Sequence, residues 1–325
     1  MAPRSNRPRW VRDAIAAGGE FHAMKKDPAR HNRINLVSSL VVAGVFIGTT
    51  LLAAVLPVGL WVPLALFLYG VVYFSVNVLV IHECSHNMFV LSRDRQRQKR
   101  LNRLIGRIAA VPFLTDYIEH WEKGHTTHHL RPCEADDPQD RDPLTGSRLW
   151  RRYALLFLVP LSFVPFNPSR QYGGSLQRAA LGLALWWLPV TLATGPTLGW
   201  HVPLAMLMGL QVTMILNWTK KAQEHGGGLA DEPDFILRSR TYLYPLAPLT
   251  SPFNINYHFE HHANFNVPWY DLPAYHRRLQ AIVPSALQPY YFHREFFSQL
   301  AGTKPLPPRE LLGLEDLGDA AAASR

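Results

Sequence analysis

Four long apolar stretches divide this chain. Uncharged apolar segments extend over Ile34–Pro57 and Val58–Ile81, and again over Ala179–Gly195 and Trp200–Trp218. A run of about 20 apolar residues is long enough to cross the hydrocarbon core of a bilayer as a helix. A short link with proline and glycine joins the two members of each pair. The pattern therefore predicts about four transmembrane helices, arranged as two helical hairpins.

Two weaker apolar stretches, Ile108–Leu114 and Tyr153–Phe166, are too short to span, so we expect them to lie in the membrane interface or to re-enter. The rest of the chain is polar enough to form a sizeable cap. The predicted fold is an all-α polytopic membrane protein with a cytoplasmic helical cap. We expect a basic N-terminal segment over residues 1–33, a membrane domain over residues 34–303 and a flexible C-terminal tail over residues 304–325.

Basic residues flank the outer ends of the first hairpin, whereas the links at Pro57 and Pro196 carry no Lys or Arg. The positive-inside rule then places both termini and the large loops on the cytoplasmic side, most simply of a bacterial inner membrane. This asymmetry and anionic lipid headgroups explain the net charge of +9 without nucleic acid. The first apolar block has full spanning length, so we expect no cleavable signal peptide. With two cysteines, Cys84 and Cys133, the chain offers no disulfide framework and no iron–sulfur site.

Eight of the 15 histidines fall into three compact clusters. These are His82 and His86; His125, His128 and His129; and His258, His261 and His262. Residues three or four apart share a helix face, so we expect each cluster to aim all its rings at one point. Neutral imidazole binds iron, zinc, copper and nickel, so the clusters predict metal binding more firmly than they predict the metal. Eight imidazoles are too many for one zinc ion and suit two metal ions.

The clusters resemble the three histidine boxes of the membrane fatty acid desaturase superfamily. The matching segments are His82-Glu83-Cys84-Ser85-His86, His125-Thr126-Thr127-His128-His129 and Asn256-Tyr257-His258-Phe259-Glu260-His261-His262. The resemblance extends from about Ile34 to Leu279 and includes the continuation Val267-Pro268-Trp269-Tyr270-Asp271-Leu272-Pro273. It implies a non-haem di-iron centre that uses O2 and two electrons to attack an unactivated C–H bond. Hydroxylases, carotenoid ketolases and epoxygenases also belong to this superfamily.

Members of the superfamily commonly supply one more histidine before the third box, and the resemblance points to His225 as this ninth ligand. The alternative is that His225 caps the end of the fourth helix, where its charged form would be favoured. Metal-bound imidazoles usually donate their second N–H to an acceptor. The candidates for this supporting role are Glu83, Glu224, Glu260, Asp137 and Asn256. His120 is a further candidate. Isolated histidines such as His276 are expected to be ordinary surface or hydrogen-bonded residues.

The resulting functional hypothesis is a membrane-bound, O2-dependent desaturase with two iron ions that acts on a fatty acyl or lipid-like chain. A hydroxylase or ketolase acting on a carotenoid or small amphiphilic metabolite is an alternative. The first box also fits the His-Glu-x-x-His pattern of zinc metalloproteases, with Glu83 as general base. The chain has no dinucleotide fingerprint, no His-Pro-Gly-Gly sequence and no cysteine quartet, so we expect an external electron donor such as ferredoxin.

Overall fold

The computed structural model describes residues 7–139, 144–159 and 180–312. In these ranges four helices are long and apolar enough to cross a membrane, which confirms the prediction of four spans. The first hairpin consists of α2 (Pro28–Leu51) and α3 (Val58–Ser75). The second consists of α9 (Leu188–Leu198), preceded by the π-helical segment η9 (Leu183–Trp187), and α10 (His201–His225).

Two of the spanning helices extend well beyond their apolar segments. α3 continues through the π-helix η4 (Val76–His82) into α4 (Glu83–Ser85), and α10 continues past Trp218 to His225. Hydropathy marks only the part of a helix that contacts lipid, whereas backbone hydrogen bonding persists into the polar residues that follow. The first histidine cluster and His225 therefore lie beyond the apolar segments, on continuations of the same helices.

α3 and α10 pack closely against each other where both carry small residues. A side chain at Gly209 would begin 2.6 Å from Cβ of Tyr69, so only glycine allows this approach. Thr213 Oγ1 of α10 donates a hydrogen bond to Gly70 O of α3 at 3.1 Å. The two helices that lead to the histidines are thereby fixed relative to each other.

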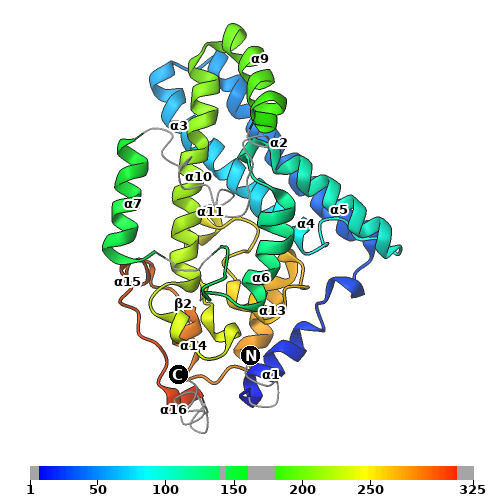
Figure 1. Ribbon diagram of the computed structural model, residues 1–325, viewed down its shortest axis with the longest axis vertical. Helices are drawn as coiled ribbons and strands as arrows, with labels where there is room; N and C mark the ends of the chain where they lie inside the picture. The colour runs from blue at the N-terminus through cyan, green and yellow to red at the C-terminus, as the bar shows by residue number, and fades with distance from the viewer. Residues whose placement is uncertain (1–6, 140–143, 160–179, 313–325) are drawn as a thin grey trace.

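The remaining elements form a helical cap at one end of the molecule (Figure 1). The elements before α10 are α1 (Arg9–Gly18), α5 (Arg95–Ala109), η5 (Val111–Phe113), the π-helix η6 (Tyr117–Lys123), α6 (Gly124–Leu130) and α7 (Gly146–Leu158). The later helices are α11 (Ala247–Thr250), α12 (His258–Ala263), α13 (Leu272–Gln280), α14 (Gln288–Tyr291), α15 (Phe296–Ala301) and α16 (Arg309–Leu312). In the described residues the strands are β1 (Thr241–Tyr242) and β2 (Phe292–His293), which pair in parallel. Short 3-10 turns complete the cap at Ala23–Lys25, Leu229–Asp231, Phe235–Arg238 and Trp269–Asp271.

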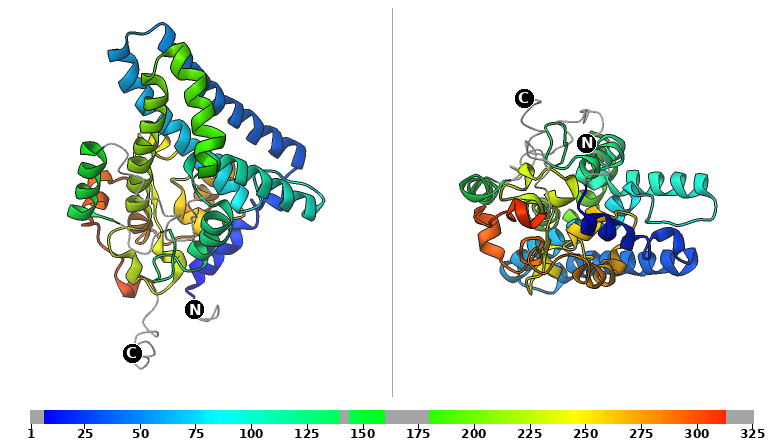
Figure 2. Two further views of the ribbon diagram at one scale, coloured as in Figure 1. Left: turned by 45° about the horizontal axis from the view of Figure 1, so that its top comes forward. Right: turned by 90° about the horizontal axis from the view of Figure 1, so that it is seen from below.

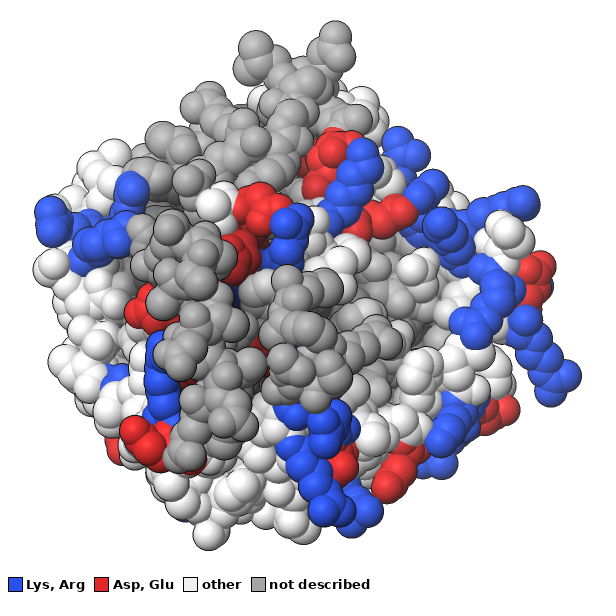
Figure 3. Space-filling view, turned by 60° about the horizontal axis from the view of Figure 1, so that its bottom comes forward, with Lys and Arg blue, Asp and Glu red and all other residues white. Residues whose placement is uncertain are grey.

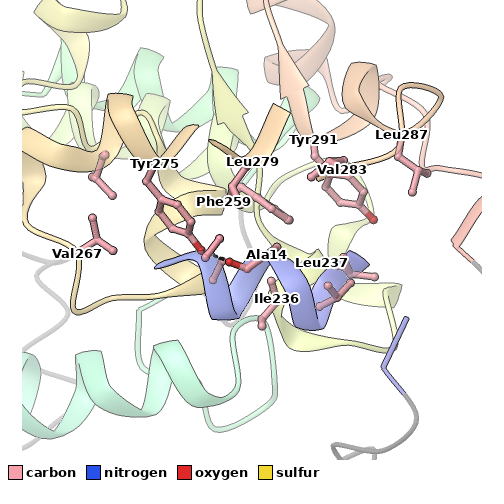
Figure 4. Close-up of a cluster of buried hydrophobic side chains, with 14 of the residues drawn as sticks. Ala14, Ile236, Leu237, Phe259, Val267, Tyr275, Leu279, Val283, Leu287 and Tyr291 are labelled. Carbon is pink, nitrogen blue, oxygen red and sulfur yellow. Dashed lines mark hydrogen bonds between the residues drawn. The ribbon is translucent and has the colours of Figure 1, made fainter. Parts of the chain in front are cut away.

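The cap has its own hydrophobic core, which joins segments far apart in the sequence (Figure 4). α1 packs against α12 and α13, and the Tyr275 hydroxyl donates to Ala14 O at 2.6 Å. Phe259 of α12 is fully buried in this core between Trp10 and Tyr291. The third histidine cluster therefore lies on a helix, α12, that packs against both the N-terminal and the C-terminal parts of the chain.

Both ends of the described chain lie with the cap, opposite the links of the two hairpins (Figures 1 and 2). α5 projects from the side of the molecule and is amphipathic, with exposed Leu104 and Ile108 among its arginines. The predicted interface stretch Ile108–Leu114 comprises the end of α5 and the turn η5. Residues 160–166 of the second weak stretch and residues 313–325 of the predicted tail lie outside the described residues.

Candidate metal centre

The three histidine clusters lie on short helices that end in the middle of the protein. His82 ends the π-helix η4, and His86 follows α4 directly. The second cluster lies on α6, which continues from the π-helix η6, and the third lies on α12. π-helical turns are rare and occur frequently at functional sites, because the extra residue rotates the following side chains to a new direction.

Nine histidines converge into two groups, and these are the nine that sequence analysis singled out. The first group contains His82, His86, His125, His129 and His261, and the second contains His128, His225, His258 and His262. Within each group one ring nitrogen from every residue lies within 4.8 Å of all the others. His225 thus ends α10 and also joins the second group. Each group has enough donors to hold a metal ion.

The second and third clusters are divided between the two groups, which corrects the expectation that each cluster points at one site. His125 and His129 are four residues apart and only about 40° apart around the helix, so they point together. His128 is rotated about 60° to the other side of His125 and points to the second group. On α12 the same geometry pairs His258 with His262 and sends His261 to the first group. One helical turn thereby supplies imidazoles to both groups.

The two groups are adjacent and mostly buried, with His86 and His129 partly exposed. His129 and His262 belong to different groups, and their ring centroids are 4.5 Å apart. Burial, followed by the nearby His128, lowers the pKa of His86 to about 3. Burial likewise holds the pKa values of the other cluster histidines that lie outside the spanning helices well below 6.5: His125, His129, His258, His261 and His262. These imidazoles are therefore neutral at physiological pH, and neutral imidazole is the form that binds metals.

Acceptors beside Nδ1 indicate which ring nitrogen carries the proton. Nδ1 of His225 lies 2.8 Å from Arg238 O, and Nδ1 of His258 lies 3.2 Å from a Glu224 carboxylate oxygen. We assign the proton of His225 to Nδ1, because only a protonated nitrogen can donate to the Arg238 oxygen, and we assign the same tautomer to His258, because the negative carboxylate beside its Nδ1 favours a proton there. The Nε2 atoms of the two rings then face each other as lone pairs, only 2.8 Å apart. A cation between them would remove this repulsion, so the donor set fits a bound metal ion.

Three of the five predicted supporting residues contact cluster histidines. Asp137 Oδ2 lies 2.9 Å from His128 Nδ1, Glu83 lies 3.4 Å from His82 Nδ1, and Glu224 contacts His258 as described above. Burial alone would raise the pKa of Asp137, but His128 and two backbone N–H donors lower it overall. Asp137 is therefore a carboxylate at neutral pH and can accept the His128 proton.

The other two predicted supporting residues have different partners. Asn256 donates to the backbone carbonyl of Tyr242, in β1, at 2.9 Å. Glu260 accepts from Thr241 Oγ1 and lies 2.5 Å from Nδ1 of His276. His276 is buried, and its contact with the third box distinguishes it from an isolated surface histidine.

Sequence reasoning missed two acceptors. Gln139 Oε1 lies 2.7 Å from His125 Nδ1, and the backbone carbonyl of Arg238 approaches His225. A backbone carbonyl has no sequence signal, because every residue carries one. Gln139 follows His125 by 14 residues and belongs to no recognisable pattern, so only the fold of the loop reveals it.

A cavity of about 130 Å³ borders both groups. His82 and His125 of the first group and His128 and His258 of the second contribute to its wall. Its other walls mix apolar and polar side chains, including Phe74, Phe113, Leu210, Met214, Asn77, Asn217, Lys220 and Lys221. His120 also lies on this wall, and burial lowers its pKa to about 3. A substrate in this cavity would lie beside both metal positions.

Four helices long and apolar enough to span a membrane, and two all-histidine groups beside one cavity that could each hold a metal ion, define the class of this protein. The family model described as "Fatty acid desaturase" matches residues 58–294, from the start of α3 to just beyond β2. This is more than half of the chain and includes all nine histidines, so the chain belongs to the fatty acid desaturase family. Comparison with curated proteins found no match. Membership of this family favours oxidative chemistry over the protease interpretation of the first box.

Proposed function

We propose that this protein is an O2-dependent, non-haem di-iron desaturase that introduces a double bond into a fatty acyl or lipid-like chain. The observation that carries the proposal is the pair of buried all-histidine groups on one cavity. An all-nitrogen neutral donor set leaves bound metal ions strongly positive, which suits oxidation of an unactivated C–H bond. Family membership favours iron over the other metals that imidazole binds.

The nine histidines would hold two iron ions, which supply the O2-dependent oxidation when bound. Overall, the reaction removes two hydrogen atoms from adjacent carbons. Together with two electrons and two protons from a reductant, these hydrogens reduce one O2 to two waters. The side chains of Asp137, Glu224 and Gln139 and the backbone carbonyl of Arg238 orient the imidazoles. Burial of the histidine groups keeps bulk water away from the reacting carbon.

We further propose that the cap and both termini face the cytoplasm, with a bacterial inner membrane as the site. The basic residues that flank the first hairpin support this orientation. Lys and Arg side chains spread over the periphery of the cap, with several along the side where α5 projects (Figure 3). An external acidic reductant such as ferredoxin would be attracted to this surface.

The test is expression in a host that lacks the activity, followed by mass spectrometry of its lipids and iron analysis of the purified protein with Mössbauer spectroscopy. We expect about two coupled irons per chain and lipids that have lost two hydrogens, with neither product nor full iron content in His128→Ala. Zinc in place of iron, or unchanged lipids despite a full iron content and an active reductant, would contradict the proposal.

A hydroxylase or ketolase acting on a small amphiphilic metabolite is the second candidate, and the polar part of the cavity wall favours it. Asn77, Asn217, Lys220 and Lys221 can hydrogen-bond an oxygen-bearing substrate, whereas a plain hydrocarbon chain gains nothing from them. The same mass spectra distinguish the two reactions, since hydroxylation adds one oxygen and desaturation removes two hydrogens.

A further inference from the structure

A large apolar groove lies on the membrane-facing side of the protein. It has a volume of about 680 Å³ and runs between α2, the α3–η4 helix, the end of α5 with η5, and η9. Its lining includes Val42, Phe46, Leu79, Ile108 and Trp186. Among all its lining residues only Ser39, Ser75, Tyr73 and the indole of Trp186 offer a polar side-chain atom. Such a surface suits hydrocarbon and offers almost nothing to a polar ligand.

The groove is open to the lipid zone. Ile47 and Ile108, which both line it, are 55% and 63% exposed, and both α2 and α3 are spanning helices.

Phe113 connects this groove to the metal centre, because its side chain lines both the groove and the cavity beside the histidines. Its ring lies edge-on to Tyr73, with centroids 5.9 Å apart. Phe113 also packs against two hydrophobic clusters, one around α3 and α10 and the other around Ile81 and Tyr117. Phe113 therefore occupies the partition between the two spaces.

The backbone around Phe113 is held in place on both sides. Trp187 Nε1 of η9 donates to Pro112 O at 3.0 Å, and Phe113 N donates to Ala110 O at 3.1 Å. Leu114, the next residue, has a left-handed backbone with φ of 57°, which is unfavourable for leucine. A chain that passes from groove to cavity would therefore have to displace the Phe113 side chain rather than its backbone.

We propose that the acyl chain of a membrane phospholipid enters the metal cavity laterally from the bilayer through this groove, and that Phe113 controls the passage. The apolar lining, the exposure to lipid and the wall shared with the cavity all favour a hydrocarbon occupant. This inference rests on the proposed function, since it assumes that the cavity receives the substrate.

The test uses the whole protein in nanodiscs made of phospholipid with a photoreactive diazirine in its acyl chain. After irradiation, mass spectrometry of peptides locates the labels. In the unmodified protein we expect labels in the groove on α2 and in the cavity at Leu210 or Met214. Phe113→Trp should keep the groove labels and lose most cavity labels, because the larger ring fills the passage. Phe113→Ala should increase cavity labelling several-fold.

Phe67→Trp is the matched control, since Phe67 is exposed on α3 and lines neither space, and its labelling should equal that of the unmodified protein. Two results would overturn the proposal. One is equal cavity labelling in Phe113→Trp and Phe113→Ala. The other is cavity labelling by an acyl thioester added from water but not by the phospholipid. Labelling needs no turnover. The expected labels without a desaturated product would therefore contradict the proposed reaction alone, and a desaturated product with normal cavity labelling in Phe113→Trp would contradict control of the passage by Phe113 alone.

Discussion

Asp137 Oδ2 lies 2.9 Å from Nδ1 of His128, and the same oxygen accepts a hydrogen bond from Cys133 N at 2.8 Å. The other oxygen, Oδ1, accepts from Gln139 N at 2.8 Å. The carboxylate is thus fixed by the loop after the second histidine cluster and in turn fixes the His128 ring with Nε2 toward the second group. The loop therefore orients His128, although it contributes no histidine to either group.

Replacing Asp137 with asparagine should weaken metal binding on the order of 10- to 100-fold, because the neutral amide is a poorer acceptor for the His128 proton. The measurement is metal retention during titration with a chelator. Asp136→Asn is the matched control, since Asp136 is exposed and pairs with Arg131. Equal retention in both variants would mean that the contact between Asp137 and His128 has no role in metal binding.

His225→Ala should remove one of the four donors of the second group and reduce the metal content from about two ions per chain toward one. We expect loss of turnover as severe as in His128→Ala or His261→Ala. Metal analysis and product assays check this. His201→Ala provides the control on the same helix, because His201 lies at the opposite end of α10, against Trp61. Full metal content in His225→Ala would mean that His225 only caps the end of α10.

His276→Ala should destabilise the protein by about 1–3 kcal/mol, because it leaves the buried Glu260 carboxylate without one of its hydrogen-bond partners. Since Glu260 lies on α12 between His258 and His261, part of the metal should be lost as well. Thermal unfolding in detergent and metal analysis measure both effects. Arg277 is the exposed neighbour of His276, and Arg277→Ala should change neither the thermal stability nor the metal content. Identical unfolding of the two variants would rule out this supporting role.

Acid should destabilise the metal-free protein through its buried neutral histidines. The pKa values of His86 and His120 fall from 6.5 to about 3 on folding, so the unfolded chain binds protons first as the pH decreases. Above pH 6.5 both rings are neutral in the folded and the unfolded chain and do not affect stability, whereas between pH 6.5 and 3 each lowers the free energy of unfolding by about 1.4 kcal/mol per pH unit. Denaturant unfolding across this range tests the slope. A stability that stays constant below pH 6 would contradict the neutral, buried state of these rings.

Charge reversal of the arginines in Arg93–Arg107 and Arg148–Arg152 should raise the KM for an acidic ferredoxin about tenfold and reduce its salt dependence. Most of these side chains are exposed on α5 and α7. Steady-state kinetics at several salt concentrations provide the measurement. The control is Arg9→Glu, which reverses an exposed charge on α1. Unchanged kinetics and salt sensitivity after reversal of both stretches would refute docking there.

Local patterns in the sequence predicted the four spans and eight of the nine converging histidines, whereas His225 came from the resemblance to the desaturase superfamily. The spans and the clusters are both local properties. Hydrophobic length decides whether a helix can cross a bilayer, and a spacing of three or four residues decides which side chains share a helix face. The acidic residues next to the clusters were also accessible from the sequence, since Glu83 and Glu224 are chain neighbours of His82 and His225.

Only the tertiary structure decided how the histidines divide into two groups, because that depends on where α6 and α12 point relative to α3 and α10. The same holds for the contacts of Gln139 and of the Arg238 carbonyl, and for the pairing of Glu260 with His276. Position in the sequence could not reveal that Phe113 lies between a lipid-facing groove and the metal cavity. These relationships join residues from 13 to 179 positions apart, and no local pattern in the chain encodes the packing that brings them together.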